Sequence, residues 1–391
     1  MKNIVGSPAR GATFLKRQGE IEKIINRLQN GNNIQIAAPR RIGKTSILFY
    51  LLDNEVNNYL YAYVDTESVD NEQDFYKKIL KELLKKDWLS NSSRLQTAIR
   101  TGKKFIKSLK SIQIVSGTIE FSETQTDYYE ELYNLLCGLE IEKKLILLLD
   151  EFPQTIINIS QVGSDGLSNA TKFLQRNREL RLDPIINQNI QFIYTGSIGL
   201  NHTVAALNAS SFINDLNSIE IGQLSKTEAI DLIIALSKEK KLKFSEDSIN
   251  YLISKIEWLI PFYIQLILQD ILFANSENSE ITQLEIDKAF DSIIEAININ
   301  HFEHYFSRLK SQFKGLELDF VLKTLADIAK NITCEKNHLF NLSVQYNVQG
   351  RFKNILEILS YDGYINNNVS QNEYRFNSPI LRLWWVKNIC E

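Results

Sequence analysis

Residues 38–45 read Ala-Pro-Arg-Arg-Ile-Gly-Lys-Thr and have the residue types and spacing of a phosphate-binding loop, although the first position is alanine rather than glycine. A strand-like run precedes them and a helix-like run follows, so backbone N–H groups at the helix start would converge on a polyphosphate. In that arrangement Lys44 pairs with the β- and γ-phosphates, and the Thr45 hydroxyl ligates Mg²⁺. The residues predicted to contact the nucleotide are Pro39, Arg40, Arg41, Ile42, Gly43, Lys44, Thr45 and Ser46.

A second motif lies further along the chain, where the apolar run 145–149 leads into Asp150 and Glu151. Such a run is typical of a strand buried on both faces of a parallel sheet, and ligands bind at the carboxyl ends of those strands. We therefore predict that Asp150 holds Mg²⁺ and that Glu151 polarises the water that attacks the γ-phosphate. The alternative is that the two carboxylates only cap a following helix.

A third polar position, Thr195, follows the apolar run 190–194. Because this run reads as another buried strand, we expect Thr195 to lie beside Asp150, within reach of the γ-phosphate or the attacking water. The alternative is an ordinary turn at the end of the strand, in which Gly196 is present for its backbone freedom.

Three arginines, Arg176, Arg178 and Arg181, lie on the helix-like segment 167–182 between the acidic pair and Thr195. An arginine supplied to a neighbouring subunit's nucleotide can accelerate phosphoryl transfer by roughly 10³–10⁵. We predict that one of the three acts in this way in an oligomer. The alternative is that they pair on the surface with Glu179 or Asp183.

The composition limits the class of protein. An apolar content of 44% and a charged content of 23% are ordinary for globular domains and exclude a disordered or fibrous chain. No apolar run approaches the length of about 20 residues that spans a bilayer, and the first residues lack the apolar core of a signal peptide. Three widely separated cysteines argue against a disulfide framework or a zinc site. We therefore expect a cytoplasmic protein without membrane contact.

The pattern of elements predicts an α/β fold with a P-loop parallel-sheet core, followed by an all-α lid and a winged helix. We place the core at 1–222, with an insertion at about 87–124, the lid at 223–298 and the winged helix at 299–391. The lid prediction rests on helix-like segments at 226–237, 246–255, 261–274 and 283–297, and the winged-helix prediction on helices near 316–329 and 350–359 and a hairpin at 363–376.

Charge is unevenly distributed along the chain. Between Asp74 and Lys110 there are eleven Lys or Arg residues against three acidic ones, and the stretch 77–110 could face nucleic acid or an acidic partner. The alternative is a solvated helical face. The segment 301–391 has eleven basic and nine acidic residues, which is nearly neutral for a DNA-binding domain, so a protein-contact or regulatory role is the stronger prediction.

Taken together, these motifs resemble those of the archaeal-type P-loop ATPases of the AAA+ and STAND group. The matching segments read Phe-Leu-Lys-Arg-Gln-Gly-Glu at 14–20, Ala-Pro-Arg-Arg-Ile-Gly-Lys-Thr-Ser at 38–46, Leu-Asp-Glu-Phe-Pro at 149–153, Tyr-Thr-Gly-Ser at 194–197 and Tyr-Arg-Phe-Asn-Ser-Pro at 374–379. The resemblance implies ATP and Mg²⁺ as cofactors and an adenine pocket lined by Arg17 and Glu20. It also implies a Gly-x-Pro contact from the lid, of which this chain retains Pro261 but not the glycine.

Three functions follow as predictions. The first is an ATP-hydrolysing switch that controls an effector protein or a nucleic-acid process, for example in defence against mobile DNA, and that turns over slowly without a partner or a homo-oligomer. The second is a DNA-binding initiator or transposition-type remodelling ATPase. The third is a nucleotide-binding scaffold that never hydrolyses ATP, against which an intact Glu151 argues.

Overall fold

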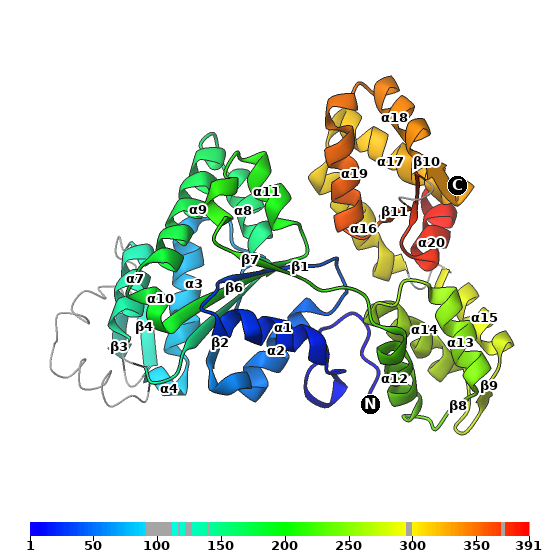
Figure 1. Cartoon of the computed structure of the whole chain (residues 1–391), viewed down its shortest axis with the longest axis horizontal. Helices are drawn as coiled ribbons and strands as arrows, with labels where there is room; N and C mark the ends of the chain where they lie inside the picture. Colours follow the sequence, from blue (N-terminus) through cyan, green and yellow to red (C-terminus); the bar gives the residue numbers. More distant parts are fainter. Residues whose placement is uncertain are drawn as a thin grey trace. The chain divides into compact units, whose positions relative to one another are not determined.

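The computed structural model describes residues 1–90, 112–115, 118–121, 127–139, 141–294, 299–368 and 372–390 (Figure 1). Most of the predicted insertion at 87–124 and of the basic stretch 77–110 lies outside these residues. The chain forms two compact units. The first unit comprises Lys16–Ala37 and Lys44–Ile221. The second unit comprises Met1–Leu15, Ala38–Gly43 and Gly222–Glu391. The boundaries 1–222, 223–298 and 299–391 remain predictions.

A five-stranded parallel sheet forms the centre of the first unit, with the strand order β2-β5-β6-β1-β7. Every residue of β5 and β6 is buried, which explains why both strands are mostly apolar in sequence. The edge strand β7 was not predicted, because its sequence, Asn-Ser-Ile-Glu, has a single apolar residue. The strands are β1 (Ile34–Ala37), β2 (Leu60–Asp65), β5 (Leu145–Asp150), β6 (Ile190–Gly196) and β7 (Asn217–Glu220).

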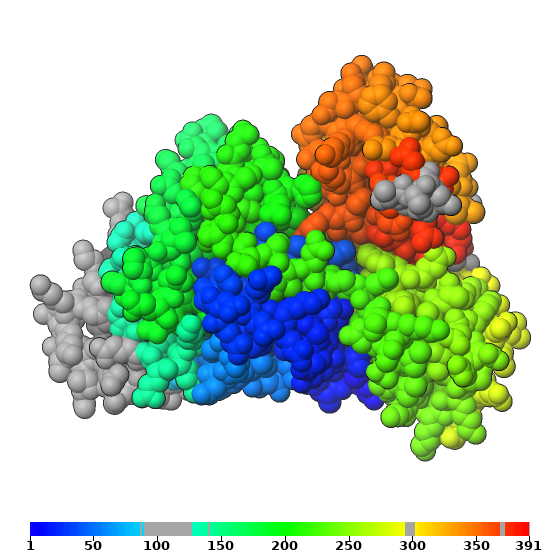
Figure 2. Space-filling view, in the orientation of Figure 1, coloured from blue at the N-terminus to red at the C-terminus, as the bar shows by residue number. Residues whose placement is uncertain are grey.

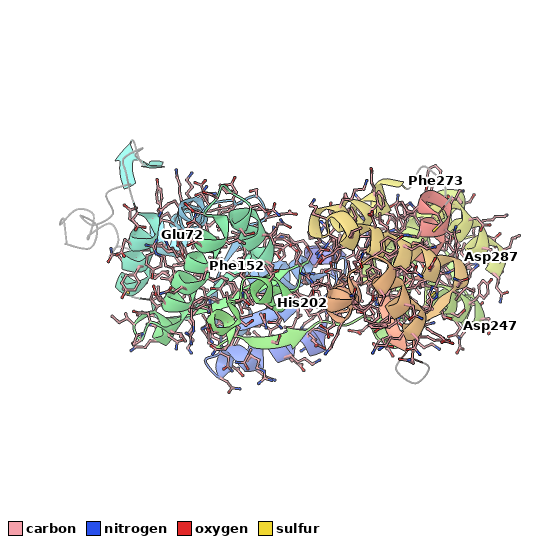
Figure 3. The ribbon with its side chains drawn as sticks, turned by 90° about the horizontal axis from the view of Figure 1, so that it is seen from above. Glu72, Phe152, His202, Asp247, Phe273 and Asp287 are labelled. Atoms are coloured by element: carbon pink, nitrogen blue, oxygen red, sulfur yellow. The ribbon has the colours of Figure 1, made fainter. Side chains whose placement is uncertain are left out.

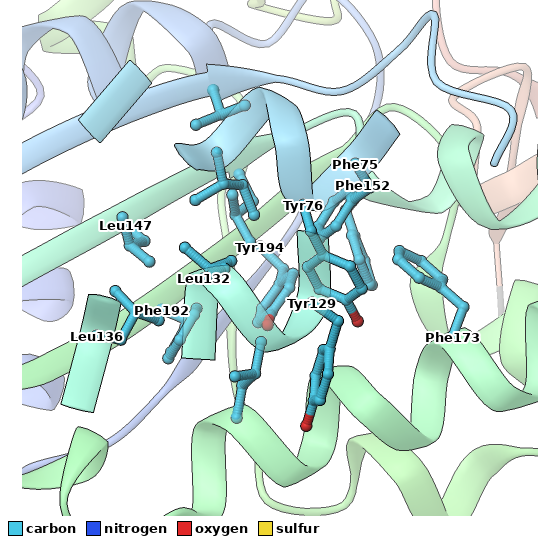
Figure 4. Packing of buried hydrophobic residues seen from close by; sticks show 14 of the residues in the cluster. Phe75, Tyr76, Tyr129, Leu132, Leu136, Leu147, Phe152, Phe173, Phe192 and Tyr194 are labelled. Atoms are coloured by element: carbon cyan, nitrogen blue, oxygen red, sulfur yellow. The ribbon is translucent and has the colours of Figure 1, made fainter. Parts of the chain in front are cut away.

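Helices cover both faces of this sheet (Figure 1). On one face, β2, β5 and β6 share a single apolar cluster with α3, α7, α8 and α9, and α1 and α2 lie on the other face. Aromatic rings fill the middle of the cluster: Phe152 packs 4.5 Å from Tyr194 and 5.7 Å from Phe75, measured between ring centroids (Figure 4). The main helices are α1 (Gln18–Gln29), α2 (Lys44–Asn54), α3 (Glu72–Leu84), α7 (Tyr128–Gly138), α8 (Phe152–Ser160) and α9 (Gly166–Leu182).

The second unit contains the four helices predicted for the lid. Pro261 begins α14, where its missing N–H costs no intrahelical hydrogen bond. The prediction of helices alone was incomplete, because β8 (Lys243–Phe244) and β9 (Glu280–Ile281) form a small parallel pair. The helices are α12 (Lys226–Ser237), α13 (Glu246–Ile256), α14 (Pro261–Ala274) and α15 (Gln283–Ile294).

The C-terminal part of this unit has the winged-helix arrangement predicted from the sequence, and Figure 2 shows it as a continuous orange and red body. Its strands pair antiparallel in the order β10-β12-β11. Trp384 and Trp385 are buried in its core. The elements are α16 (Ile299–Gln312), α17 (Gly315–Asn331), β10 (Thr333–Glu335), α18 (Lys336–Gln345), α19 (Phe352–Tyr361), β11 (Ile365–Asn368), β12 (Glu373–Phe376) and α20 (Pro379–Ile389).

The predicted α/β class with a helical region and a winged helix is therefore confirmed. Within the described residues, no helix combines the length and apolarity needed to cross a membrane.

Candidate phosphate and metal site

The predicted phosphate-binding loop lies between β1 and α2, as expected from the sequence. Lys44 is the first residue of α2 and is buried, and Thr45 beside it is half-buried. Gly43 has a φ of 100°, in the left-handed region that favours glycine, which explains the glycine before the lysine. The backbone therefore turns sharply where the sequence pattern requires it.

The carboxylate of Asp150 is the centre of the hydrogen bonding at the carboxyl edge of the sheet. Thr45 Oγ1 donates to its Oδ2 at 2.7 Å, and the Tyr63 hydroxyl donates to the same oxygen at 3.1 Å. Thr195 Oγ1 donates to Oδ1, which also accepts the Glu151 backbone N–H at 3.1 Å. Residues from three neighbouring parallel strands and from the start of α2 thus converge on one buried carboxylate.

Burial sets the electrostatics of this carboxylate. It raises the pKa of Asp150, while the hydroxyl of Thr195 opposes that shift by stabilising the charged form. Burial also raises the pKa of Tyr63, and the negative charge of Asp150 adds to the effect, so the phenol stays protonated and donates. The charge of Lys44 also opposes the shift of the Asp150 pKa, and a cation at this position would stabilise the charged carboxylate further.

Glu151 has an unusual backbone and an unusual partner. Its φ of 57° lies in the left-handed region, and its side chain makes no capping hydrogen bond to α8, so the helix-cap alternative is not what the structure shows. Instead its Oε2 accepts the backbone N–H of Ser197 at 3.0 Å and the Ser197 hydroxyl at 2.9 Å. The residue after Glu151, Phe152, anchors this end of α8 in the core of the unit (Figure 3).

Gly196 is required for close packing. A Cβ at this position would lie 2.7 Å from Cγ of Pro153, far inside van der Waals contact. The φ of Gly196 is not positive, so the alternative that this glycine is present for its backbone freedom is wrong. The tip of β6 and the start of α8 therefore pack directly on each other.

The three arginines of α9 bind acidic residues of their own unit, but not Glu179 or Asp183. Arg176 pairs with Glu72 at 3.2 Å and Arg178 lies 3.9 Å from Asp215. Arg181 is 1% exposed and binds Asp215 through two hydrogen bonds of 2.8 and 2.9 Å. Since a buried arginine cannot reach a neighbour, Arg176 and Arg178, each 36% exposed, remain the candidates for a role in trans.

Arg41 belongs to the second unit, as do Gly6 and Phe262, which it contacts. Its guanidinium donates to the Gly6 carbonyl at 2.9 Å and lies 4.8 Å from the centroid of the Phe262 ring. Burial lowers the pKa of Arg41, and the neighbouring Arg40 lowers it further. Its contact with phosphate, like those of Pro39, Arg40, Ile42 and Ser46, remains a prediction.

The residues assigned to the adenine pocket lie at the start of α1. Arg17 is buried and forms an ion pair with Glu20, with an N–O distance of 2.8 Å. The roles of both residues in base recognition, and that of Pro261 in the lid, remain predictions from the resemblance.

Tyr63 and Ser197 are the two residues of this site to which the sequence had assigned no role. Tyr63 is one tyrosine among the alternating residues of β2, and nothing in that pattern distinguishes it. Ser197 closes the segment Tyr-Thr-Gly-Ser at 194–197, and its place in that segment, next to the strand tip, is the signal that could have indicated it.

The oxygen donors of this site fit Mg²⁺. Thr45 and Asp150 offer a hydroxyl and a carboxylate, and Mg²⁺ in proteins is held by one or two such groups together with water and phosphate oxygens. Among the described residues, no three His, Cys, Asp or Glu side chains cluster as a larger metal centre would require. The site is therefore suited to a cation that arrives with a polyphosphate.

Comparisons with known proteins give the fold. No family model and no curated protein matches the chain. Among solved structures, it is similar to a Walker-type ATPase of Pyrococcus abyssi, with a TM-score of 0.64 and 16% identity over 98% of this chain and 99% of the other. It is also similar to the ORC2 protein of Aeropyrum pernix in its ADPNP–ADP complexes, with a TM-score of 0.57 and 15% identity over 99% and 95% of the two chains. The chain therefore shares, over nearly its full length, the fold of a Walker-type ATPase and of an ORC2 protein, as its motifs predicted.

Proposed function

We propose that this protein is a Mg²⁺-dependent ATPase that acts as a molecular switch. The observation that carries the proposal is the meeting of Thr45, Thr195 and the Asp150 carboxylate at one edge of the parallel sheet, with Lys44 beginning the adjacent helix. Open parallel sheets bind ligands at this edge, and a helix N-terminus there favours phosphate.

Each residue has a distinct part in the proposed reaction. Lys44 binds the β- and γ-phosphates, and Thr45 and Asp150 hold the cation. When bound, Mg²⁺ would neutralise charge on the phosphate oxygens. Glu151 orients the attacking water and accepts its proton, and Thr195 fixes the Asp150 carboxylate and lies within reach of that water.

A partner would control the rate of ATP turnover in such a switch. All three arginines of α9 bind acidic groups of their own chain, so none is presented to a neighbour without rearrangement. We infer that basal turnover is slow and that a homo-oligomer or an effector protein releases Arg176 or Arg178 for use in trans. A role in defence against mobile DNA fits such a switch.

A second candidate function is DNA-responsive remodelling, which the winged helix favours. At the start of α19, Arg351 and Lys353 have side chains that are 55% and 89% exposed, so both can reach a phosphate backbone. Stimulation of ATP turnover by duplex DNA, lost in Lys353→Glu, would support this candidate over control by a protein effector. A scaffold that binds ATP without turnover is the third candidate.

Steady-state hydrolysis tests the proposed function. The wild-type chain should release phosphate from ATP with Mg²⁺ and stop when the metal is chelated. Lys44→Ala should abolish ATP binding, whereas Lys143→Ala, which changes a surface lysine 3.5 Å from Glu55, should leave hydrolysis unchanged. Binding without any turnover in the wild-type chain, alone or with DNA, would favour the scaffold and contradict the ATPase.

A further inference from the structure

We propose that Ser197 is a positioning residue for the hydrolysis, because its hydroxyl and backbone N–H hold the Glu151 carboxylate where it can orient the attacking water. The inference rests on the proposed ATPase function and adds a residue to it. Ser197 is 7% exposed, and neither of its contacts with Glu151 involves the nucleotide or the metal ligand Asp150.

The two carboxylate oxygens of Glu151 differ in their hydrogen bonding to Ser197. Both donors reach Oε2, at 3.0 Å from the backbone nitrogen and 2.9 Å from the hydroxyl, so Oε1 accepts neither of them. A general base must present a lone pair within hydrogen-bonding distance of the proton it removes. Oε2 therefore serves as the anchor, and Oε1 as the atom that accepts the proton of the water.

The support for Ser197 is rigid. β5 and β6 pair in parallel with Leu149 opposite Tyr194, which brings Glu151 and Ser197, just beyond these residues, to the same edge of the sheet. Gly196 packs against Pro153 so closely that no Cβ fits between them. The backbone N–H of Ser197 is therefore held at a fixed place relative to the start of α8.

Glu151 needs such an anchor more than most residues. Its side chain has several rotatable bonds and is only half-buried. The Glu151 side chain also makes no capping hydrogen bond with α8 that would hold it in place. Ordering a flexible side chain during the reaction costs conformational entropy, whereas a side chain that is held in place beforehand carries no such cost. The contact with Ser197 orders Glu151 before ATP binds.

The first experiment compares Ser197→Ala, Ser197→Thr and a matched control, Ser160→Ala, whose hydroxyl donates to the Ile157 carbonyl within α8. Loss of a hydrogen bond to a charged group should lower kcat by about tenfold or more. The KM for ATP should stay within about twofold, because phosphate binding does not use this contact. Ser197→Thr should restore most of the rate, and the control should match the wild type.

The second experiment shows whether Ser197 acts through Glu151. In a Glu151→Gln background, Ser197→Ala should cause no further loss of kcat, since the group that it positions has already been disabled. An equal loss in both backgrounds would show a structural effect on the site and overturn the inference. An unchanged or increased kcat in the single variant would also overturn it, and an increase would mean that the contact restrains the base.

Amide hydrogen exchange tests the contact without any turnover. The Ser197 N–H should exchange at least about tenfold faster in Glu151→Ala than in the wild type, because its acceptor is gone. Equal exchange would overturn the inference. If the wild-type chain does not hydrolyse ATP, the ATPase proposal and this inference both fail, whereas hydrolysis that Ser197→Ala leaves unchanged contradicts only the inference.

Discussion

Thr195→Val removes a single hydrogen-bond donor from the centre of the site. Valine has nearly the shape of threonine, and Thr195 is 2% exposed, so packing is retained while the Asp150 carboxylate loses the hydroxyl at Oδ1. That oxygen keeps the Glu151 N–H, and Oδ2 keeps Thr45 and Tyr63. The change therefore isolates one contact to a buried charge.

The number of donors that remain on Asp150 sets the expected loss of stability. A hydrogen bond to a charged group contributes about 1.5–3 kcal/mol, and because three donors remain we expect the lower value, about 1.5 kcal/mol. For a domain of this size, that loss lowers the melting temperature by about 3–6 °C. Because the predicted role of Thr195 also concerns the reacting water, kcat should fall by about tenfold or more, with ATP affinity nearly unchanged.

Thermal unfolding without nucleotide, followed by circular dichroism, measures the first effect, and phosphate release measures the second. Thr171→Val is the matched control, because the exposed Thr171 hydroxyl donates to the Leu167 carbonyl within its own helix, α9. A Thr195→Val protein that melts and hydrolyses ATP like the wild type would refute the reasoning, since Asp150 would not depend on this donor.

Three further predictions concern other parts of the molecule. Arg181→Ala should destabilise the protein by about 3–5 kcal/mol in denaturant unfolding, because the mostly buried Asp215 loses its two short hydrogen bonds and keeps the longer contact with Arg178, at 3.9 Å. Arg178→Ala should cost less than about 1 kcal/mol, and equal losses would contradict the burial argument. Gly196→Ala should cost about 1–3 kcal/mol by overpacking against Pro153, and wild-type stability would contradict the close contact. Charge reversal at three lysines of the basic stretch should weaken binding to nucleic acid or an acidic partner in salt-matched assays without changing basal turnover, and unchanged binding would indicate a solvated surface. The lysines are Lys103, Lys104 and Lys107.

The sequence predicted the elements whose patterns are local. The continuous apolar run 145–149 identified a buried strand, and the glycine turn before Lys44 identified the loop, because each pattern reflects the burial or the backbone of its own segment. The edge strand β7 was missed, since an exposed polar strand carries no such pattern. Local sequence patterns therefore predicted most of the core and the edge of the sheet at which the candidate site lies.

Of the contacts that depend on which strands are neighbours, that of Thr195 with Asp150 was predicted, but those of Tyr63 and Ser197 were not. Tyr63 reaches Asp150 only because β2 pairs with β5, and Ser197 reaches Glu151 only because β6 is the next strand. The acidic partners suggested for the α9 arginines, Glu179 and Asp183, were wrong for a related reason. Helical spacing suggested nearby acidic residues, but the tertiary fold brings Glu72 and Asp215 closer.

Single-turnover hydrolysis by Glu151→Gln tests the central claim most directly. The variant should bind ATP with Mg²⁺ as tightly as the wild type, because Lys44, Thr45 and Asp150 are intact, and should convert it to ADP at least about tenfold more slowly. Glu82→Gln, on the surface of α3 beside Lys85, is the matched control and should behave like the wild type. Conversion of bound ATP at the wild-type rate by Glu151→Gln would contradict the assignment of the base, and with it the proposed chemistry of this site.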